Sequence, residues 1–142
     1  MEEVWELHSF LDIVGRFLNL QTGQKRDAKG RRMTDETMIF PRYHQLDCVR
    51  KLVDSAKVNG AGENYLVQHS TGSGKSMSIA WLAHRLHSLH DDADDKIYDS
   101  VVVITDRRVL DRQIRDTIYQ IDHRDGVVEY IEHSSELAEA LE

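Results

Sequence analysis

Cysteine is almost absent from this chain of 142 residues, since Cys48 is the single one. One cysteine excludes an internal disulfide and favours a reducing compartment, and its helical surroundings predict that Cys48 is a small buried apolar residue. Long apolar runs are absent too, because none approaches the roughly 18 residues of a membrane span. The acidic amino-terminal residues do not resemble a secretion signal. These absences predict a cytoplasmic protein with no membrane partner.

Net positive charge is also lacking, because 25 acidic residues outweigh 18 basic ones and leave a net charge of −7. Such a chain is not expected to coat nucleic acid non-specifically, so any DNA contact has to be local. One basic run is compatible with a local DNA contact and equally with a mobile surface loop. Its members are Lys25, Arg26, Lys29, Arg31 and Arg32.

Residues 69–76 read His-Ser-Thr-Gly-Ser-Gly-Lys-Ser, which is the pattern of a phosphate-binding loop. Gly72 and Gly74 allow the backbone to turn its N–H groups toward phosphate oxygens. Lys75 can reach the β- and γ-phosphates, Ser76 can ligate Mg²⁺, and the helix that follows directs its positive end at the anion. A histidine replaces the first glycine of the general pattern, which indicates a subclass of the loop. The predicted nucleotide-binding residues here are Thr71, Gly72, Ser73, Gly74, Lys75 and Ser76.

The segments around this loop have the order that a phosphate-binding loop requires. Residues 64–68 are a short apolar run typical of a buried strand, and residues 79–89 carry one apolar face at helical spacing. Residues 100–104 and, more weakly, residues 127–131 predict further strands. Strands that alternate with helices predict an α/β fold with a parallel sheet flanked by helices. The flanking pattern disfavours the alternative, a Gly/Ser turn that contains Lys-Ser by chance.

Other segments are predicted from periodicity and from helix-end signals. They are a helix over residues 4–20, a loop or charged linker over residues 21–36, and a helix that has Pro41 in its first turn and ends at residues 59–62. Later come a helix capped by Thr105 or Asp106 that runs through Ile121, and a short helix capped by Ser134 or Ser135 that runs through Leu141.

Three segments together resemble the superfamily-two helicases and translocases. Residues 40–45, Phe-Pro-Arg-Tyr-His-Gln, are similar to the glutamine-containing motif upstream of the phosphate loop in that family. Residues 69–76 are similar to its motif I, and residues 101–114 to its motif Ia. The amino-acid sequences of the last two segments are more similar still to those of the motor (R) subunit of type I restriction–modification enzymes. The resemblance spans roughly residues 35–141.

This resemblance implies a partial RecA-like P-loop lobe over residues 37–142, preceded by an N-terminal helix and charged linker over residues 1–36. It implies that ATP and Mg²⁺ are cofactors, and that Gln45 contacts adenine with support from Arg42. From the residues alone, Gln45 would otherwise be a solvated helix residue. The implied partners are double-stranded DNA and the methyltransferase and specificity subunits of a restriction–modification complex. The implied DNA-contacting residues are Thr105, Arg107 and Arg108, for which an ordinary exposed helix start is the alternative.

Several parts of that family are not found in the chain. No Asp-Glu pair of the Walker B type follows a buried strand, and no arginine finger, second lobe or nuclease cluster is present. The expectation is therefore an incomplete first lobe that binds nucleotide without turning it over, whereas the intact subunit would use ATP hydrolysis to translocate DNA and would cleave it. The sheet of such a piece is expected to have a gap.

Three alternatives stay open at this point. They are another superfamily-two translocase such as a type III restriction subunit, a non-catalytic remnant or interaction module, and, ranked last, a small-molecule phosphotransferase. A metal site on His84, His87 and His90 is disfavoured, because the three fan across about 120° of a helix and a solvated face is simpler.

Overall fold

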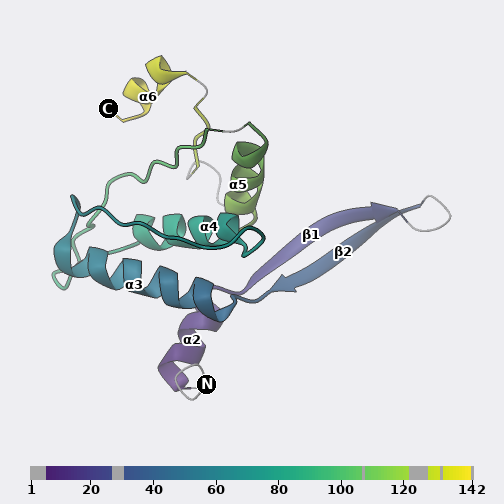
Figure 1. Ribbon diagram of the computed structural model, residues 1–142, viewed down its shortest axis with the longest axis horizontal. Helices are drawn as coiled ribbons and strands as arrows, with labels where there is room; N and C mark the ends of the chain where they lie inside the picture. The colour runs from purple at the N-terminus through teal and green to yellow at the C-terminus, as the bar shows by residue number, and fades with distance from the viewer. Residues whose placement is uncertain (1–5, 27–30, 107, 122–127, 132, 142) are drawn as a thin grey trace.

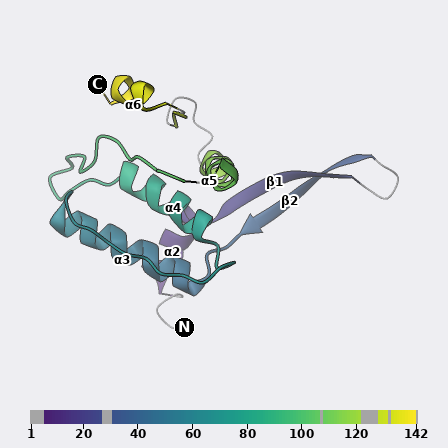
Figure 2. The same ribbon diagram turned by 45° about the horizontal axis from the view of Figure 1, so that its top comes forward.

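The computed structural model describes residues 6–26, 31–106, 108–121, 128–131 and 133–141 (Figure 1). The elements in chain order are α2 (Leu7–Arg16), β1 (Asn19–Arg26), β2 (Arg32–Ile39), α3 (Tyr43–Asn59), α4 (Lys75–His87), α5 (Arg108–Ile121) and α6 (Ser134–Ala140). Helices α3 and α4 lie side by side, α2 packs across them at one end, and the β1–β2 hairpin projects away from them (Figure 2). Among the described helices, none is long and apolar enough to cross a lipid bilayer.

Helix α3 has well-defined signals at both ends. Pro41 is buried just before it, and Arg42 is its N-cap residue with an extended backbone (φ −72°, ψ 154°). The side-chain Oε1 of Gln45 accepts a hydrogen bond of 2.9 Å from the Arg42 backbone N–H, so one donor at the helix start is satisfied. The helix ends at Gly60, whose φ of 69° is readily adopted only by glycine.

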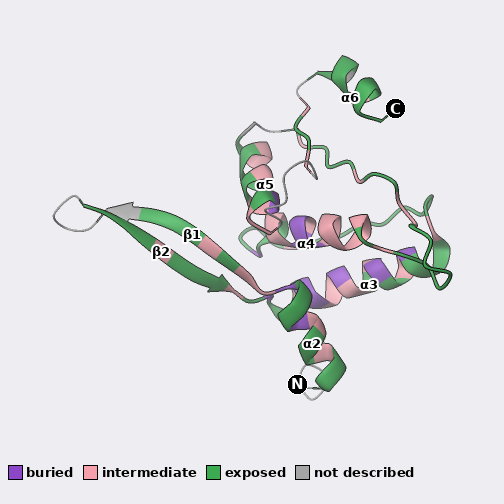
Figure 3. Ribbon diagram, turned by 180° about the vertical axis from the view of Figure 1, so that it is seen from behind, coloured by how far each residue is buried: buried purple, intermediate pink, exposed green. Residues whose placement is uncertain are grey.

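The main core lies between α2, α3 and α4 (Figure 3). Phe17 and Trp81 are 0% and 1% exposed, and their ring centroids are 5.6 Å apart. A second cluster joins α4 to α5 through Ala80, Ile114 and Ile118. The remaining buried members of the main core are Ile13, Leu46, Val49 and Val53.

A half-buried ion network ties α2 to the other two helices. Asp12 accepts a hydrogen bond of 2.6 Å from Arg85 on α4 and one of 2.9 Å from Arg50 on α3. The three side chains are between 14% and 27% exposed. Burial raises the pKa of Asp12, but the hydrogen bonds and positive charges of Arg85 and Arg50 outweigh it, and the pKa lies below its ordinary value. The carboxylate therefore stabilises the fold in its charged form.

Residues 21–36 are predicted as a loop or linker, but residues 21–26 and 32–36 instead belong to two antiparallel strands. Strands β1 and β2 pair in unbroken register from Asn19↔Ile39 to Arg26↔Arg32. The preceding helix accordingly ends at Arg16, although periodicity predicts it through residue 20. The many charges and two glycines suggest a loop, but strand pairing depends on partners distant in sequence and overrides this local composition.

The predicted parallel sheet is not present among the described residues, where the only sheet is the β1–β2 pair. Residues 64–68 and 100–104, predicted as buried strands, have no strand partner and are largely exposed, with Leu66 at 94% and Ile104 at 86%. Residues 128–131 are not a strand either, and the predicted turn at residues 125–126 lies outside the described residues. A strand forms only when a partner satisfies its backbone, so apolar β-branched composition is not sufficient.

Two smaller predictions are corrected. Cys48 is half-buried rather than buried, and burial followed by the charge of Asp47 raises the pKa of its thiol. The last short helix is capped one residue earlier than predicted, at His133, whose backbone N–H donates to the Glu136 carboxylate at 3.3 Å.

Replacing Asp12 with asparagine should lower the free energy of unfolding by about 2 kcal/mol at neutral pH, because Arg50 and Arg85 lose their counter-charge. The folded pKa of Asp12 lies below the unfolded value of 3.8. The stabilisation is therefore fully present above that unfolded value and is lost as the pH falls through the folded pKa. Urea unfolding of both proteins at neutral pH and at about pH 3 measures the difference.

The matched control is Asp47→Asn, because Asp47 pairs with the exposed Lys51 on the surface of α3 and such pairs contribute little. Equal stability of wild type and Asp12→Asn at neutral pH would contradict the role of the network, as would a difference that does not shrink in acid.

Candidate nucleotide-binding site

The phosphate-loop segment, residues 69–76, is a turn that leads directly into the first residues of α4. Gly72 and Gly74 have φ values of 77° and 83°, in the region that side chains other than glycine rarely adopt. A Cβ placed on Gly74 would also lie 2.5 Å from Nε2 of Gln45. The geometry of the loop therefore requires both glycines. Gly72 is needed for its backbone conformation, and Gly74 is needed both for its conformation and because a Cβ would collide with Gln45.

Lys75 is folded back across the loop that it terminates. Its Nζ donates hydrogen bonds of 2.8 Å to the Ser70 carbonyl and 3.2 Å to the His69 carbonyl. Phosphate oxygens are acceptors of the same kind, so an incoming phosphate can replace these carbonyls as partners of the ammonium group. Ser73 is 8% exposed, and its buried Oγ has no hydrogen-bond partner in the described part of the chain. Thr71 is exposed and Ser76 is half-buried in the first turn of α4.

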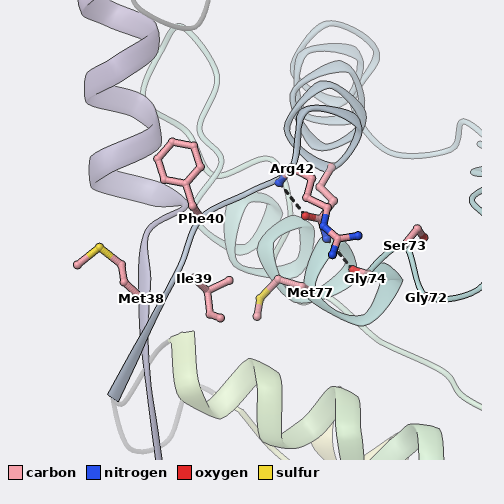
Figure 4. A pocket seen from close by; sticks show the side chains of 9 residues that line it. Met38, Ile39, Phe40, Arg42, Gly72, Ser73, Gly74 and Met77 are labelled. Atoms are coloured by element: carbon pink, nitrogen blue, oxygen red, sulfur yellow. Dashed lines mark hydrogen bonds between the residues drawn. The ribbon is translucent and has the colours of Figure 1, made fainter. Parts of the chain in front are cut away.

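Gln45 is only 5% exposed, so it is not a solvated helix residue. It lies against the loop. Its Nε2 donates a hydrogen bond of 2.9 Å to the Gly74 carbonyl, while its Oε1 accepts from the Arg42 backbone (Figure 4). One side-chain amide thus connects the start of α3 with the end of the loop. Each polar atom of the amide has a partner within the protein, as burial requires.

His44 is a site residue that the sequence analysis does not identify. Its Nε2 lies 3.0 Å from the Ser73 carbonyl, and because a carbonyl only accepts, Nε2 carries the proton. The His44 ring also meets the His69 ring edge to face, with centroids 5.0 Å apart. The first turn of α3 therefore holds two consecutive carbonyls of the loop. The signal available in the sequence is only that His44 precedes Gln45 in the upstream motif.

A pocket of about 360 Å³ opens between the loop and the segment that precedes α3 (Figure 4). Apolar side chains from β2 and α4 form one wall, and Arg42 and Gln45 supply polar groups. Its size and its mixture of apolar surface with a few polar groups suit a small ligand. The lining residues are Met38, Ile39, Phe40, Arg42, Gln45, Gly72, Ser73, Gly74 and Met77.

Of the predicted DNA-contacting residues, Thr105 lies just before α5 and does not line this pocket. Thr105 is half-buried, and its hydroxyl donates to Asp111 at 3.1 Å, which ties the preceding segment to the helix. Arg107 lies outside the described residues. Arg108 is the first residue of α5, and its side chain is outside what the structure describes.

No described group of three or more histidine, cysteine or carboxylate residues is arranged to hold a metal ion. His84 instead has its Nε2 3.1 Å from the Ile118 carbonyl on α5.

A glycine-containing turn that ends in Lys-Ser, opens a helix and adjoins a pocket is the arrangement of phosphate-loop ATPases. The family model of the SWI2/SNF2 ATPases matches residues 44–142. The chain belongs to the SWI2/SNF2 ATPase family. The matched range includes Gln45, the loop and all of α4 and α5, and membership implies nucleotide use, typically with Mg²⁺.

The chain is also similar to a protein of Methanocaldococcus jannaschii named "Putative type I restriction enzyme MjaVIIIP endonuclease subunit". The two are 28% identical over 129 residues, which cover 86% of this chain. The chain spans about an eighth of that relative, since the aligned part is 12% of it. No solved structure matches the chain.

Replacing Gly74 with alanine should destabilise the protein more than replacing Gly72. At Gly72 only the positive φ resists a side chain, at a cost of about 1–2 kcal/mol, because nothing lies within 4 Å of the added Cβ. At Gly74 the Cβ also displaces the Gln45 amide from its hydrogen bond, which adds about 1 kcal/mol or more. Urea unfolding measures each free energy.

A double-mutant cycle isolates the contact. In a Gln45→Ala background, Gly74→Ala should cost no more than Gly72→Ala, because the obstructing amide is gone. If the excess cost of Gly74→Ala persists without the Gln45 side chain, the packing of this amide against the loop is not its cause.

Proposed function

We propose that the chain is the ATP-binding part of the DNA-translocating motor of a type I restriction endonuclease. The observation that carries the proposal is the phosphate loop held by the upstream glutamine beside a pocket, in a member of the SWI2/SNF2 ATPases. The restriction assignment rests on the similarity to the archaeal subunit. Residues 37–142 would be part of the first RecA-like lobe, with residues 1–36 an N-terminal addition. That boundary falls within β2.

The residues present fit Mg²⁺-ATP. The buried Ser73 hydroxyl, which has no partner in the described residues, is a donor that a triphosphate can use. The Lys75 ammonium group, which donates to loop carbonyls in the structure, is another. Gly72, Ser73, Gly74 and Lys75 would hold the phosphates with Thr71, and Ser76 would ligate the Mg²⁺. The cation neutralises phosphate charge when it is bound. The helix α4, which starts at Lys75, directs its positive end toward the same group.

The pocket beside the loop would hold the base, with Arg42 and Gln45 on its polar side. Gln45 would contact adenine, because an amide both donates and accepts and so matches the exocyclic amine and a ring nitrogen of that base. The apolar wall formed by Met38, Phe40 and Met77 suits a planar ring.

The activity of a whole subunit lies beyond these residues. As the resemblance to type I restriction motor subunits implies, the intact protein would couple ATP hydrolysis to translocation of double-stranded DNA, would cleave it, and would act with methyltransferase and specificity subunits. Thr105, Arg107 and Arg108 would lie near the DNA. We propose that the 142-residue chain alone binds nucleotide without turnover, because it lacks a Walker B pair.

A second candidate is another superfamily-two DNA translocase, such as a type III restriction subunit. It is favoured because the matched family model is that of the SWI2/SNF2 ATPases and names no restriction type, and because the identity to the type I relative is a modest 28%. Both candidates predict the same nucleotide site, and they differ in the parts of the protein outside this chain.

Lys75→Ala should weaken binding of a fluorescent ATP analogue with Mg²⁺ by about tenfold or more, because charge-assisted hydrogen bonds to phosphate contribute about 1.5–3 kcal/mol. Equilibrium titration monitored by anisotropy measures it. Lys51→Ala, which removes an exposed lysine on α3, is the control and should bind like wild type. A folded wild-type chain that does not bind ATP would instead favour a non-catalytic remnant or interaction module.

Gln45→Ala should have two effects on nucleotide binding. Affinity for ATP and GTP should both fall, because the loop loses its hydrogen bond from the Gln45 amide to Gly74. The preference for ATP over GTP should also disappear, because the adenine contact is lost. Competition titrations with both nucleotides separate the two effects. Weaker binding with an unchanged preference would restrict Gln45 to supporting the loop.

A further inference from the structure

Position 69 has a histidine where the general phosphate-loop pattern has a glycine. The glycines Gly72 and Gly74 have positive φ values, but His69 does not, because Asp94 is the one non-glycine residue with a positive φ among those described. The backbone at position 69 therefore does not require glycine, and it carries a side chain without strain. What the imidazole ring contributes must then come from its contacts.

The His69 ring contacts another ring and not a hydrogen-bonding group. Its Nδ1 atom is buried and has no hydrogen-bond partner in the described part of the chain. The ring meets that of His44 edge to face, with centroids 5.0 Å apart, which is an arrangement that aromatic pairs favour. His69 therefore serves as an aromatic surface against which the His44 imidazole rests.

This contact matters for the loop, because His44 has to present one particular nitrogen to it. The Nε2 atom of His44 donates to the Ser73 carbonyl, 3.0 Å away. A neutral imidazole can carry its proton on either nitrogen, and the ring can turn about its Cβ–Cγ bond. A second ring packed against it opposes this rotation, so that Nε2 stays directed at Ser73.

The two carbonyls held by α3 also fix the direction of two backbone donors. In a planar trans peptide, the C=O group and the N–H group of the next residue point in opposite directions. His44 holds the Ser73 carbonyl, so the N–H of Gly74 points away from the first turn of α3. Gln45 holds the Gly74 carbonyl in the same way (Figure 4), and the N–H of Lys75 also points away. Neither N–H donates to a backbone carbonyl of the described residues, so both are available to an anion at the start of α4.

We propose that His69 is a positioning residue of the nucleotide site and acts through His44. Its ring holds the His44 imidazole in the orientation that fastens the Ser73 carbonyl, and the N–H of Gly74 is thereby directed at a phosphate group. Neither histidine lines the pocket beside the loop, so neither is assigned a contact with the base. That the anion is a nucleotide rests on the proposed function, whereas the coupling of the two histidines does not.

The first measurement follows the His44 ring in the absence of nucleotide, by ¹⁵N NMR of the imidazole nitrogens at about pH 8, where an ordinary histidine is neutral. The signals of His44 are assigned by their loss in His44→Ala. Wild type should carry the His44 proton on Nε2. His69→Phe keeps an aromatic ring and should give the same result, whereas His69→Ala should show the proton shared between the two nitrogens. A His44 spectrum that is unchanged in His69→Ala would overturn the proposal.

The second measurement is equilibrium binding of a fluorescent ATP analogue with Mg²⁺. His69→Ala should weaken binding about twofold to tenfold, as expected for the loss of one aromatic pair, and His69→Phe should bind like wild type. In a His44→Ala background, His69→Ala should cause no further loss, because the ring through which it acts is absent. The control is His90→Ala, which removes an exposed histidine away from the loop and should bind like wild type.

Equal losses in His69→Phe and His69→Ala would show that a ring nitrogen contacts the ligand, and would overturn the positioning role. Additive losses from His44 and His69 would overturn it too. If His69→Ala does not fold, His69→Leu takes its place in both measurements, because leucine fills space without an aromatic ring. A folded wild-type chain that binds no ATP analogue would overturn the proposed function, and the NMR result would still decide whether His69 orients His44.

Discussion

The hydrogen bonds of the Gln45 side chain attach residues 69–76, the segment with the phosphate-loop pattern, to the start of α3. This amide joins the N-cap of α3 to the Gly74 carbonyl, where the loop ends and α4 begins. A carboxylate at this position could accept from the Arg42 backbone N–H but could not donate to the Gly74 carbonyl. An apolar side chain could make neither of these two hydrogen bonds. Because Gly74 lacks a Cβ, the amide can approach the backbone closely. The bond from His44 to the Ser73 carbonyl adds a second attachment one residue earlier.

The loop is therefore positioned by helices rather than by a sheet in the described part of the chain. Helices α3 and α4 share a core with α2, in which Phe17 at the end of α2 packs against Trp81 of α4. Asp12 adds an electrostatic connection between α2 and both of them. Exposed apolar residues in the segments on either side, such as Leu66 and Ile104, contribute nothing to this framework. Burying them against further strands would add stabilisation that the present contacts do not supply.

Local features of the sequence predict the helices and the loop well. Pro41 and Gly60 bracket α3, and the positive φ of Gly72 and Gly74 follows from the phosphate-loop pattern. The hairpin and the unpaired segments could not be predicted in the same way, because strand pairing depends on residues distant in sequence. The residues of the strand β2 are rich in charge and give no alternating apolar pattern, so they read as a linker. The role of His44 also depends on a distant partner, Ser73.

Holding the loop and contacting adenine are compatible tasks for one amide. A glutamine amide has two N–H donors and two acceptor lone pairs. In this structure, the protein contacts of Gln45 use one donor, toward Gly74, and one lone pair, toward Arg42. One donor and one acceptor remain on a side chain that lines the pocket, and adenine offers one of each along the edge that glutamine commonly pairs with. The bonds that hold the loop also fix the plane of the amide, so an adenine bound there would meet donor and acceptor groups that are already oriented. Contact with guanine along the same edge would place its carbonyl oxygen where adenine places an amine, and an amide held in this orientation cannot rotate to accommodate it without releasing the loop.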